Sequence, residues 1–140
     1  MGGNYFTDDL PTSQCWLVWD KEKPEGVSFA DVELAWTSFD SASRIFHFAW
    51  NGMIQGDMKH KEMKIHPTQK PIALYEWILN RYVQGNDIIL DTHVGSASSL
   101  IACRKTGHKY VGFEIDKVYY EAAKSRLDAE ESQMNIFDFI

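Results

Sequence analysis

Hydrophobic residues in the first half of the chain occur in short runs, several of which alternate with polar residues. This spacing is typical of β-strands, and loops rich in Pro, Gly and charged residues separate the runs. The strands are predicted at residues 15–20, 32–38 and 44–50. We expect the last two to form an antiparallel pair, followed by a polar, basic loop over residues 51–66.

The hydrophobic spacing changes in the second half, where apolar residues recur every three or four positions between short apolar runs. Such positions fall on one face of a helix, so helices and strands are expected to alternate. Helices are predicted at residues 68–82, 98–106 and 116–129, with strands at 87–91 and 109–114. Strands that alternate with helices indicate an α/β fold with a parallel sheet.

Composition narrows the class of protein. A chain of 140 residues fits one domain, and its net charge of −6 excludes overall electrostatic attraction to nucleic acid. The basic residues gather locally, at Lys59, Lys61 and Lys64. Cys15 and Cys103 lack the spacing of metal ligands and are expected to be reduced thiols of a cytoplasmic protein. Neither a signal peptide nor a membrane-spanning stretch is present in this sequence.

Two predicted strands in the second half end in an acidic residue, and the first leads through small residues into a helix. Asp91 ends one strand, Gly95 and Ser96 lie in the turn, and Glu114 ends the next strand. Both acids would face the crevice where parallel sheets bind nucleoside cofactors, with Glu114 placed to accept two ribose hydroxyls. This spacing alone does not separate a dinucleotide from S-adenosylmethionine. The absence of Gly-x-Gly-x-x-Gly argues against a nicotinamide cofactor and a nicotinamide-dependent oxidoreductase.

The order of the motifs in the second half resembles a known family. A His-Pro-Thr-Gln-Lys-Pro segment at residues 66–71 precedes the turn at 91–98 and the strand end at 112–116, which Tyr119 or Tyr120, Ala123 and Arg126 follow. This arrangement resembles the C-terminal half of DNA adenine N6- and cytosine N4-methyltransferases, most closely those of phages and restriction–modification systems. Further similar segments extend the resemblance over nearly the whole chain, at residues 2–6, 15–21, 33–39 and 50–53.

The resemblance implies a Rossmann-like S-adenosylmethionine-dependent methyltransferase fold that acts on double-stranded DNA. It also implies that residues in three segments bind S-adenosylmethionine, with Glu114 on the ribose and Ile115 on the adenine. The expected cofactor-binding residues are His66, Thr68, Lys70, Pro71, Asp91, Thr92, His93, Gly95, Ser96, Ala97, Ser98, Glu114, Ile115 and Asp116.

The turn departs from the family pattern Asp-Pro-Phe-x-Gly-Ser-Gly-Thr at four positions. Thr92 replaces the Pro, His93 the Phe, Ala97 the second Gly and Ser98 the Thr. His93 is expected to stack over the cofactor in place of the Phe. Ala97 adds a methyl group beside the cofactor, although a position at a helix start is expected to tolerate Ala conformationally.

The sequence contains no copy of the family's catalytic motif, Asp/Asn-Pro-Pro-Tyr/Phe, which holds the target amino group and stacks on the flipped base. Its prolines, at positions 11, 24, 67 and 71, are never adjacent. The resemblance implies that a central strand carrying this motif is also missing. We therefore expect an incomplete fold with no catalytic residues. The chain would be inactive alone and would be a fragment or one half of a split enzyme, paired with an upstream polypeptide or a second copy. The expected target is the adenine N6 position rather than cytosine N4.

Two further segments have alternative interpretations. Lys59, Lys61 and Lys64 are candidate DNA contacts, and a solvated basic loop explains them equally well. Trp50, which opens this loop, is a further candidate contact, although packing is the preferred interpretation of the tryptophans. Gln133, Ile136 and Phe137 have the spacing of a peptide that binds the bacterial sliding clamp, or they cover the domain's own core.

These features predict one partial methyltransferase domain over residues 1–140, in the cytoplasm of a bacterium or a phage-infected host. Its expected parts are a strand-rich region, a short recognition loop, a cofactor-binding region and a tail, at residues 1–50, 51–66, 67–129 and 130–140. A non-catalytic module that binds cofactor or DNA is the alternative function.

Overall fold

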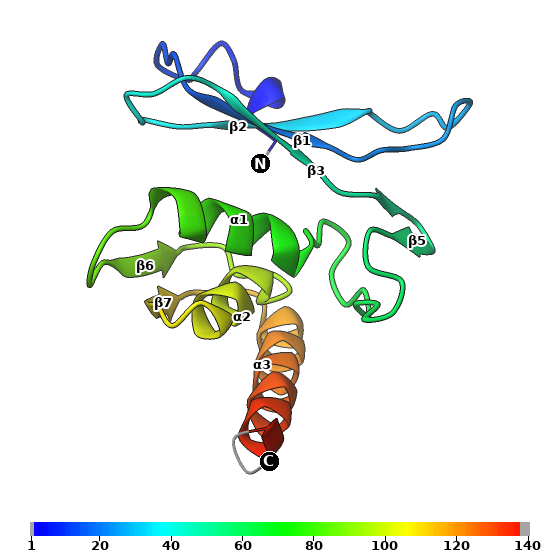
Figure 1. Ribbon diagram of the computed structural model, residues 1–140, viewed down its shortest axis with the longest axis vertical. Coiled ribbons are helices and arrows are strands. Elements are labelled where there is room, and N and C mark those ends of the chain that lie inside the picture. Colours follow the sequence, from blue (N-terminus) through cyan, green and yellow to red (C-terminus); the bar gives the residue numbers. More distant parts are fainter. Residues whose placement is uncertain (1, 138–140) are drawn as a thin grey trace. The chain divides into compact units, whose positions relative to one another are not determined.

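The computed structural model describes the backbone of residues 2–137 and the side chains of residues 2–132. The chain divides into two compact units, Met1–Lys61 and Glu62–Ile140 (Figure 1). The first unit contains η1 (Gly3–Tyr5), β1 (Trp16–Asp20), β2 (Val32–Trp36), β3 (Arg44–His47), β4 (Trp50–Asn51) and β5 (Ile54–Gln55). The second unit contains α1 (Ile72–Tyr82), β6 (Ile88–Asp91), α2 (Ser98–Lys105), β7 (Lys109–Gly112) and α3 (Lys117–Phe137).

Strand β1 is the central strand of the first unit. Cys15, just before it, and Leu17 and Trp19 within it are at most 2% exposed, because alternate side chains of a strand point to the same face. The indole N–H of Trp19 donates to the Phe48 carbonyl oxygen at 3.0 Å, so its polar group is paired within the core. This apolar face forms the core of the first unit.

The pairing of the strands corrects one expectation from the sequence. Strands β2 and β3 do not pair with each other; both pair with β1, giving the order β2-β1-β3. Strand β2 is antiparallel to β1, whereas β3 is parallel to it, with Asp20 opposite His47. The alternating pattern of residues 44–50 is also split, because β3 ends at His47 and the short hairpin β4–β5 follows. The most buried strand takes the centre, where both of its edges are paired.

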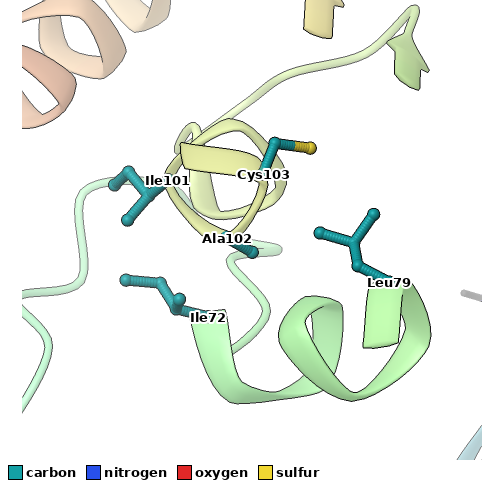
Figure 2. Packing of buried hydrophobic residues seen from close by; sticks show 5 residues of the cluster. All are labelled: Ile72, Leu79, Ile101, Ala102 and Cys103. Atoms are coloured by element: carbon teal, nitrogen blue, oxygen red, sulfur yellow. The ribbon is translucent and has the colours of Figure 1, made fainter. Parts of the chain in front are cut away.

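Helices α1 and α2 form the core of the second unit. Helix α1 begins just after Pro71. Ile72 and Leu79 of α1 lie one heptad apart and pack with Ile101, Ala102 and Cys103 of α2 (Figure 2). All five of these residues are at most 6% exposed. Burial, together with the nearby charge of Asp91, raises the pKa of the Cys103 thiol to about 11.

The parallel two-stranded sheet β6–β7 has helices packed on one face. Ile89 and Tyr110, paired across the two strands, pack against the helical core. The alternate residues point to the opposite face, where Ile88, Leu90 and Val111 are 63%, 62% and 46% exposed within the described part of the chain. The α/β architecture is therefore present in incomplete form, with one apolar sheet face uncovered.

Helix α3 is longer than the sequence pattern predicts. It continues from Lys117 to Phe137, where a helix ending at residue 129 and a tail are expected. Two salt bridges from α2 reach the start of this extension: Arg104 pairs with Glu131, and Lys105 pairs with Glu130 at 3.5 Å. Basic residues in the last turn of α2 thus hold the C-terminal half of α3.

The proposed clamp-binding residues Gln133, Ile136 and Phe137 have a helical backbone, but their side chains lie outside the described residues. No helix in the described part of the chain is long and apolar enough to cross a membrane.

Candidate cofactor-binding site

The carboxyl ends of β6 and β7 lie side by side, and the turn after β6 folds across the end of β7. Asp91 pairs with Gly112 in the ladder, the Phe113 N–H donates to the Asp91 carbonyl at 2.9 Å, and the Val94 N–H donates to the Phe113 carbonyl at 3.0 Å. A Cβ at Gly112 would lie 2.6 Å from Val94 and 2.8 Å from Leu100. Only glycine allows the turn and α2 to approach this strand so closely.

Asp91 fastens this turn to α2. Its Oδ1 accepts the His93 N–H at 2.9 Å, and its Oδ2 accepts the Ser99 hydroxyl. The first bond holds the residues that follow the strand, and the second holds the first turn of the helix. Both carboxylate oxygens therefore shape the turn, and each keeps a further acceptor position for a ligand.

Glu114 fixes the opposite side of the turn. Its Oε2 accepts the Gly95 N–H at 2.8 Å, and its Oε1 accepts the Asp116 N–H at 2.9 Å. These backbone donors, chiefly Asp116 and then Gly95, hold the pKa of Glu114 below its usual value, because they favour the charged form. Parallel strand order thus brings Asp91 and Glu114 to one edge, with Glu114 ionised at neutral pH.

The backbone of the turn is left-handed at two positions, Gly95 with φ 55° and Ala97 with φ 62°. The expectation that Ala97 is conformationally tolerated is wrong. Ala97 lies immediately before α2, where the chain reverses in a left-handed conformation. A residue with a Cβ adopts this conformation at a cost of about 1–2 kcal/mol, which Gly avoids.

His66 lies against the same turn. A Cβ at Gly95 would meet the His66 ring at 3.5 Å, so the ring packs directly on the turn backbone. The ring also contacts Tyr119 of α3 edge-on, with centroids 4.2 Å apart. Its Nδ1 faces the Thr68 hydroxyl at 3.1 Å, and Lys70 Nζ donates to the Thr68 carbonyl at 2.9 Å. The structure thus brings the 66–71 segment and the turn together.

The expected cofactor residues fall into three groups by their exposure to solvent. Pro71, Ser96, Ala97 and Ser98 are buried, so their side chains support the turn from within. The half-buried members, at the rim, are His66, Lys70, Asp91, Gly95 and Glu114. The exposed members are Thr68, Thr92, His93, Ile115 and Asp116. Ile115 is 101% exposed beside the ionised Glu114, so an apolar surface and an anion lie next to each other.

Two residues that hold the backbone around the 66–71 segment were not predicted from the sequence as site residues. Gln69 is 4% exposed; its Oε1 accepts the Ile65 N–H at 2.9 Å and its Nε2 donates to the Met63 carbonyl at 3.1 Å. Glu62 accepts the N–H of Ile72, the first residue of α1, at 2.8 Å. The signal for Gln69 was its place within the 66–71 motif, whereas no local pattern marked Glu62.

The candidate DNA contacts lie partly on the surface. The Lys59, Lys61 and Lys64 side chains are exposed. The turn at Lys59 is capped by Asp57, whose pKa is lowered chiefly by the His60 side chain. Trp50 is half-buried, with its ring 6.5 Å from that of Phe48, which favours a packing role. Among the described residues, no cluster of His, Cys, Asp and Glu is suited to hold a metal ion.

A parallel strand pair with two acids around a strand–turn–helix is typical of Rossmann-like nucleoside-binding folds, and a solved structure supports this fold. The crystal structure of the M1.HpyAVI–SAM complex aligns with a TM-score of 0.57 at 21% identity, covering 89% of this chain and 67% of that one. The model of the N6/N4 DNA methylase family matches residues 8–125, and the chain belongs to this family.

Two curated relatives are similar over the same length of sequence. Type II methyltransferase M.HpaI of Haemophilus parainfluenzae is 43% identical over 81 residues, or 58% of this chain and 25% of that protein. Type II methyltransferase M2.DpnII of Streptococcus pneumoniae is 35% identical over 81 residues, or 58% of this chain and 30% of that protein. The matched region thus spans about a quarter to a third of these relatives.

Proposed function

We propose that this chain binds S-adenosylmethionine at the turn after β6 and forms the cofactor-binding part of a DNA methyltransferase. The observation that carries the proposal is Glu114, a carboxylate two residues after β7 that backbone donors keep ionised. A carboxylate has two acceptor oxygens, which suits the paired hydroxyls of a ribose. The solved neighbour named as a SAM complex supports the choice of nucleoside.

The neighbouring residues fit the remainder of this ligand. The exposed Ile115 side chain supplies an apolar surface for the adenine next to the Glu114 carboxylate. The exposed His93 lies on the turn and is placed to stack on the ligand. Gly95 leaves open backbone beside His66. When bound, S-adenosylmethionine supplies the activated methyl group, and this chain's residues hold and orient it.

Methyl transfer needs groups beyond those in this sequence. No pair of adjacent prolines is present, so no Asp/Asn-Pro-Pro-Tyr/Phe motif can hold a flipped base. We propose that another segment supplies it, in a longer form of this chain or in a separate polypeptide. We propose adenine N6 rather than cytosine N4 as the target.

DNA contact is proposed for the exposed lysines at positions 59, 61 and 64. Their ammonium groups suit phosphates, which position a protein on DNA without reading its sequence. Neutralising Lys61 in Lys61→Gln should reduce the slope of log affinity against log salt by about 0.9 for double-stranded DNA. The exposed Lys109 at the start of β7 provides the matched control, Lys109→Gln. Equal slopes for both variants would remove this segment from the DNA interface.

Calorimetry with S-adenosylmethionine tests the cofactor site. Glu114→Gln should weaken binding about ten- to a hundredfold, because hydrogen bonds to a charged acceptor contribute about 1.5–3 kcal/mol. Glu121→Gln, which neutralises an exposed acid on α3, should leave affinity unchanged. Absence of binding by the unmodified chain, with and without DNA, would overturn the proposal.

A methylation assay separates an enzyme part from the alternative, a non-catalytic cofactor- or DNA-binding module. The chain should bind cofactor but transfer no methyl group to unmethylated DNA alone. Added polypeptide carrying the Asp-Pro-Pro-Tyr motif should restore transfer if the chain is half of an enzyme. Binding that persists without any transfer in this complemented reaction would favour the binding module. Robust transfer by the chain alone would contradict our assignment of the missing catalytic groups.

A further inference from the structure

A shielded ion pair lies beneath the cofactor turn. Arg126 of α3 donates from Nη2 to Glu62 Oε2 at 2.6 Å, and the two side chains are 13% and 14% exposed. The other oxygen of Glu62 accepts the Ile72 N–H at the start of α1. The carboxylate thus joins the guanidinium to the helix that follows the 66–71 segment.

The same guanidinium holds the turn on both sides of its left-handed alanine. Arg126 Nη1 donates to the Ser96 carbonyl oxygen at 2.8 Å and to the Ser98 Oγ at 2.9 Å. Ala97 lies between these two serines with φ 62°. Arg126 therefore clamps the residues that flank the disfavoured backbone conformation.

We propose that Arg126 is a positioning residue for cofactor binding, which holds Ala97 in its left-handed conformation while Glu62 orients the guanidinium. This inference rests on the proposed cofactor site, because it concerns the turn that forms that site. The position of the Gly95 N–H, which Glu114 accepts, depends on the path of the chain through Ala97. Without the clamp, the turn would relax toward conformations that residues with a Cβ prefer.

Lysine cannot replace this arginine. A guanidinium presents donors in a fixed planar fork, so one group bonds Glu62, Ser96 and Ser98 together. An ammonium retains the charge and the attraction to Glu62 but lacks the fork. Arg126→Lys therefore removes the clamp while it keeps the charge of the site.

The experiment compares Arg126→Lys with Arg104→Lys in the full chain. Arg104 joins α2 to α3 through Glu131 and has no described bond to the turn. Arg126→Lys should weaken S-adenosylmethionine binding about tenfold, whereas Arg104→Lys should change it by less than about twofold. Glu62→Gln keeps an oxygen for the Ile72 N–H but loses the charge, and should have an intermediate effect. Equal losses in both arginine variants would overturn the proposal.

Rescue by glycine distinguishes positioning from general stability. Glycine adopts positive φ without a clamp, so adding Ala97→Gly to Arg126→Lys should restore affinity to within about threefold of Ala97→Gly alone. A merely structural role for Arg126 predicts no such rescue, and its absence would contradict the inference.

Amide hydrogen exchange separates failure of this inference from failure of the proposed function. In the ligand-free chain, Arg126→Lys should speed exchange at Gly95 and Ala97, and Arg104→Lys should not. If the unmodified chain binds no S-adenosylmethionine, the proposed function fails, and exchange at the turn alone decides whether Arg126 holds it. Unchanged exchange in Arg126→Lys would overturn the positioning role.

Discussion

Each unit of the molecule contains a parallel strand pair in which one strand ends in an aspartate, and the two ends differ in what lies opposite that acid. In the first unit Asp20 is opposite His47, whose Nδ1 lies 3.0 Å from the carboxylate. In the second unit Asp91 is opposite Gly112. The histidine side chain meets the first acid within the sheet, whereas the glycine leaves room for the turn and α2 to close over the second.

This difference shows what converts a strand end into the start of an ordered turn. Asp20 bonds a neighbouring side chain and the Glu22 N–H, and no helix follows within the first unit. Asp91 and Glu114 instead order a backbone turn that opens α2. A carboxylate at a strand end therefore does not by itself order such a turn, because the following helix start must also be bonded to it.

Removing one charge at each strand end should give the largest contrast. Asp91→Asn should lower the free energy of unfolding by about 1.5–3 kcal/mol, because bonds from His93 and Ser99 to a half-buried charged acceptor are weakened. Asp20→Asn should cost less than about 1 kcal/mol, because its contact with His47 is partly exposed to solvent, with side-chain exposures of 32% and 53%. Urea unfolding measures both. Similar losses in the two variants would abolish the comparison.

Glycine at position 97 should act in the opposite direction. Ala97→Gly should raise the free energy of unfolding by less than about 1 kcal/mol, because relief of the strain at positive φ, about 1–2 kcal/mol, exceeds the loss of its buried methyl group, about 0.8 kcal/mol. Ala102→Gly, in the interior of α2, should lower it by at least about 1 kcal/mol through lost helix propensity and burial. Thermal unfolding of the pair measures the signs. A destabilised Ala97→Gly protein would show that the turn tolerates alanine without strain.

Acid should reveal the smallest effect, at Glu114. Its folded pKa is lowered, so its contribution to stability is present above the unfolded value, about 4.3, and is lost as pH falls through the folded pKa. The stability difference between the unmodified chain and Glu114→Gln should therefore shrink between about pH 6 and pH 3. Urea midpoints across this range measure it. A constant difference would mean that the backbone donors do not favour the charged form.

The second unit was largely predictable from sequence because its chemistry is local. Helical spacing, a strand ending in Asp91 and the motif at residues 66–71 lie in continuous segments, and the α/β class and the methyltransferase family are confirmed. The individual cofactor residues remain predictions, although the structure gathers the 66–71 segment and both acids around one turn.

What sequence could not supply depends on contacts between distant residues. Strand β3 pairs in parallel with β1, the most buried strand. The alternation of apolar and polar residues in the sequence does not show which strand is the most buried. The positive φ of Ala97 follows from how the turn meets α2. The bond between Glu62 and Arg126 joins residues 64 positions apart, and its carboxylate resembles any surface acid in the sequence.

Each unit contains one buried cysteine, whose rate of chemical modification reports on the opening of that unit. Cys15 in the first unit and Cys103 in the second are both 0% exposed, and no other cysteine is present in the sequence. A thiol reagent reaches a shielded thiol only when the surrounding structure opens, so the rate of modification measures how often each unit opens. Peptide mapping after timed alkylation would give the two rates from one sample of the unsubstituted chain.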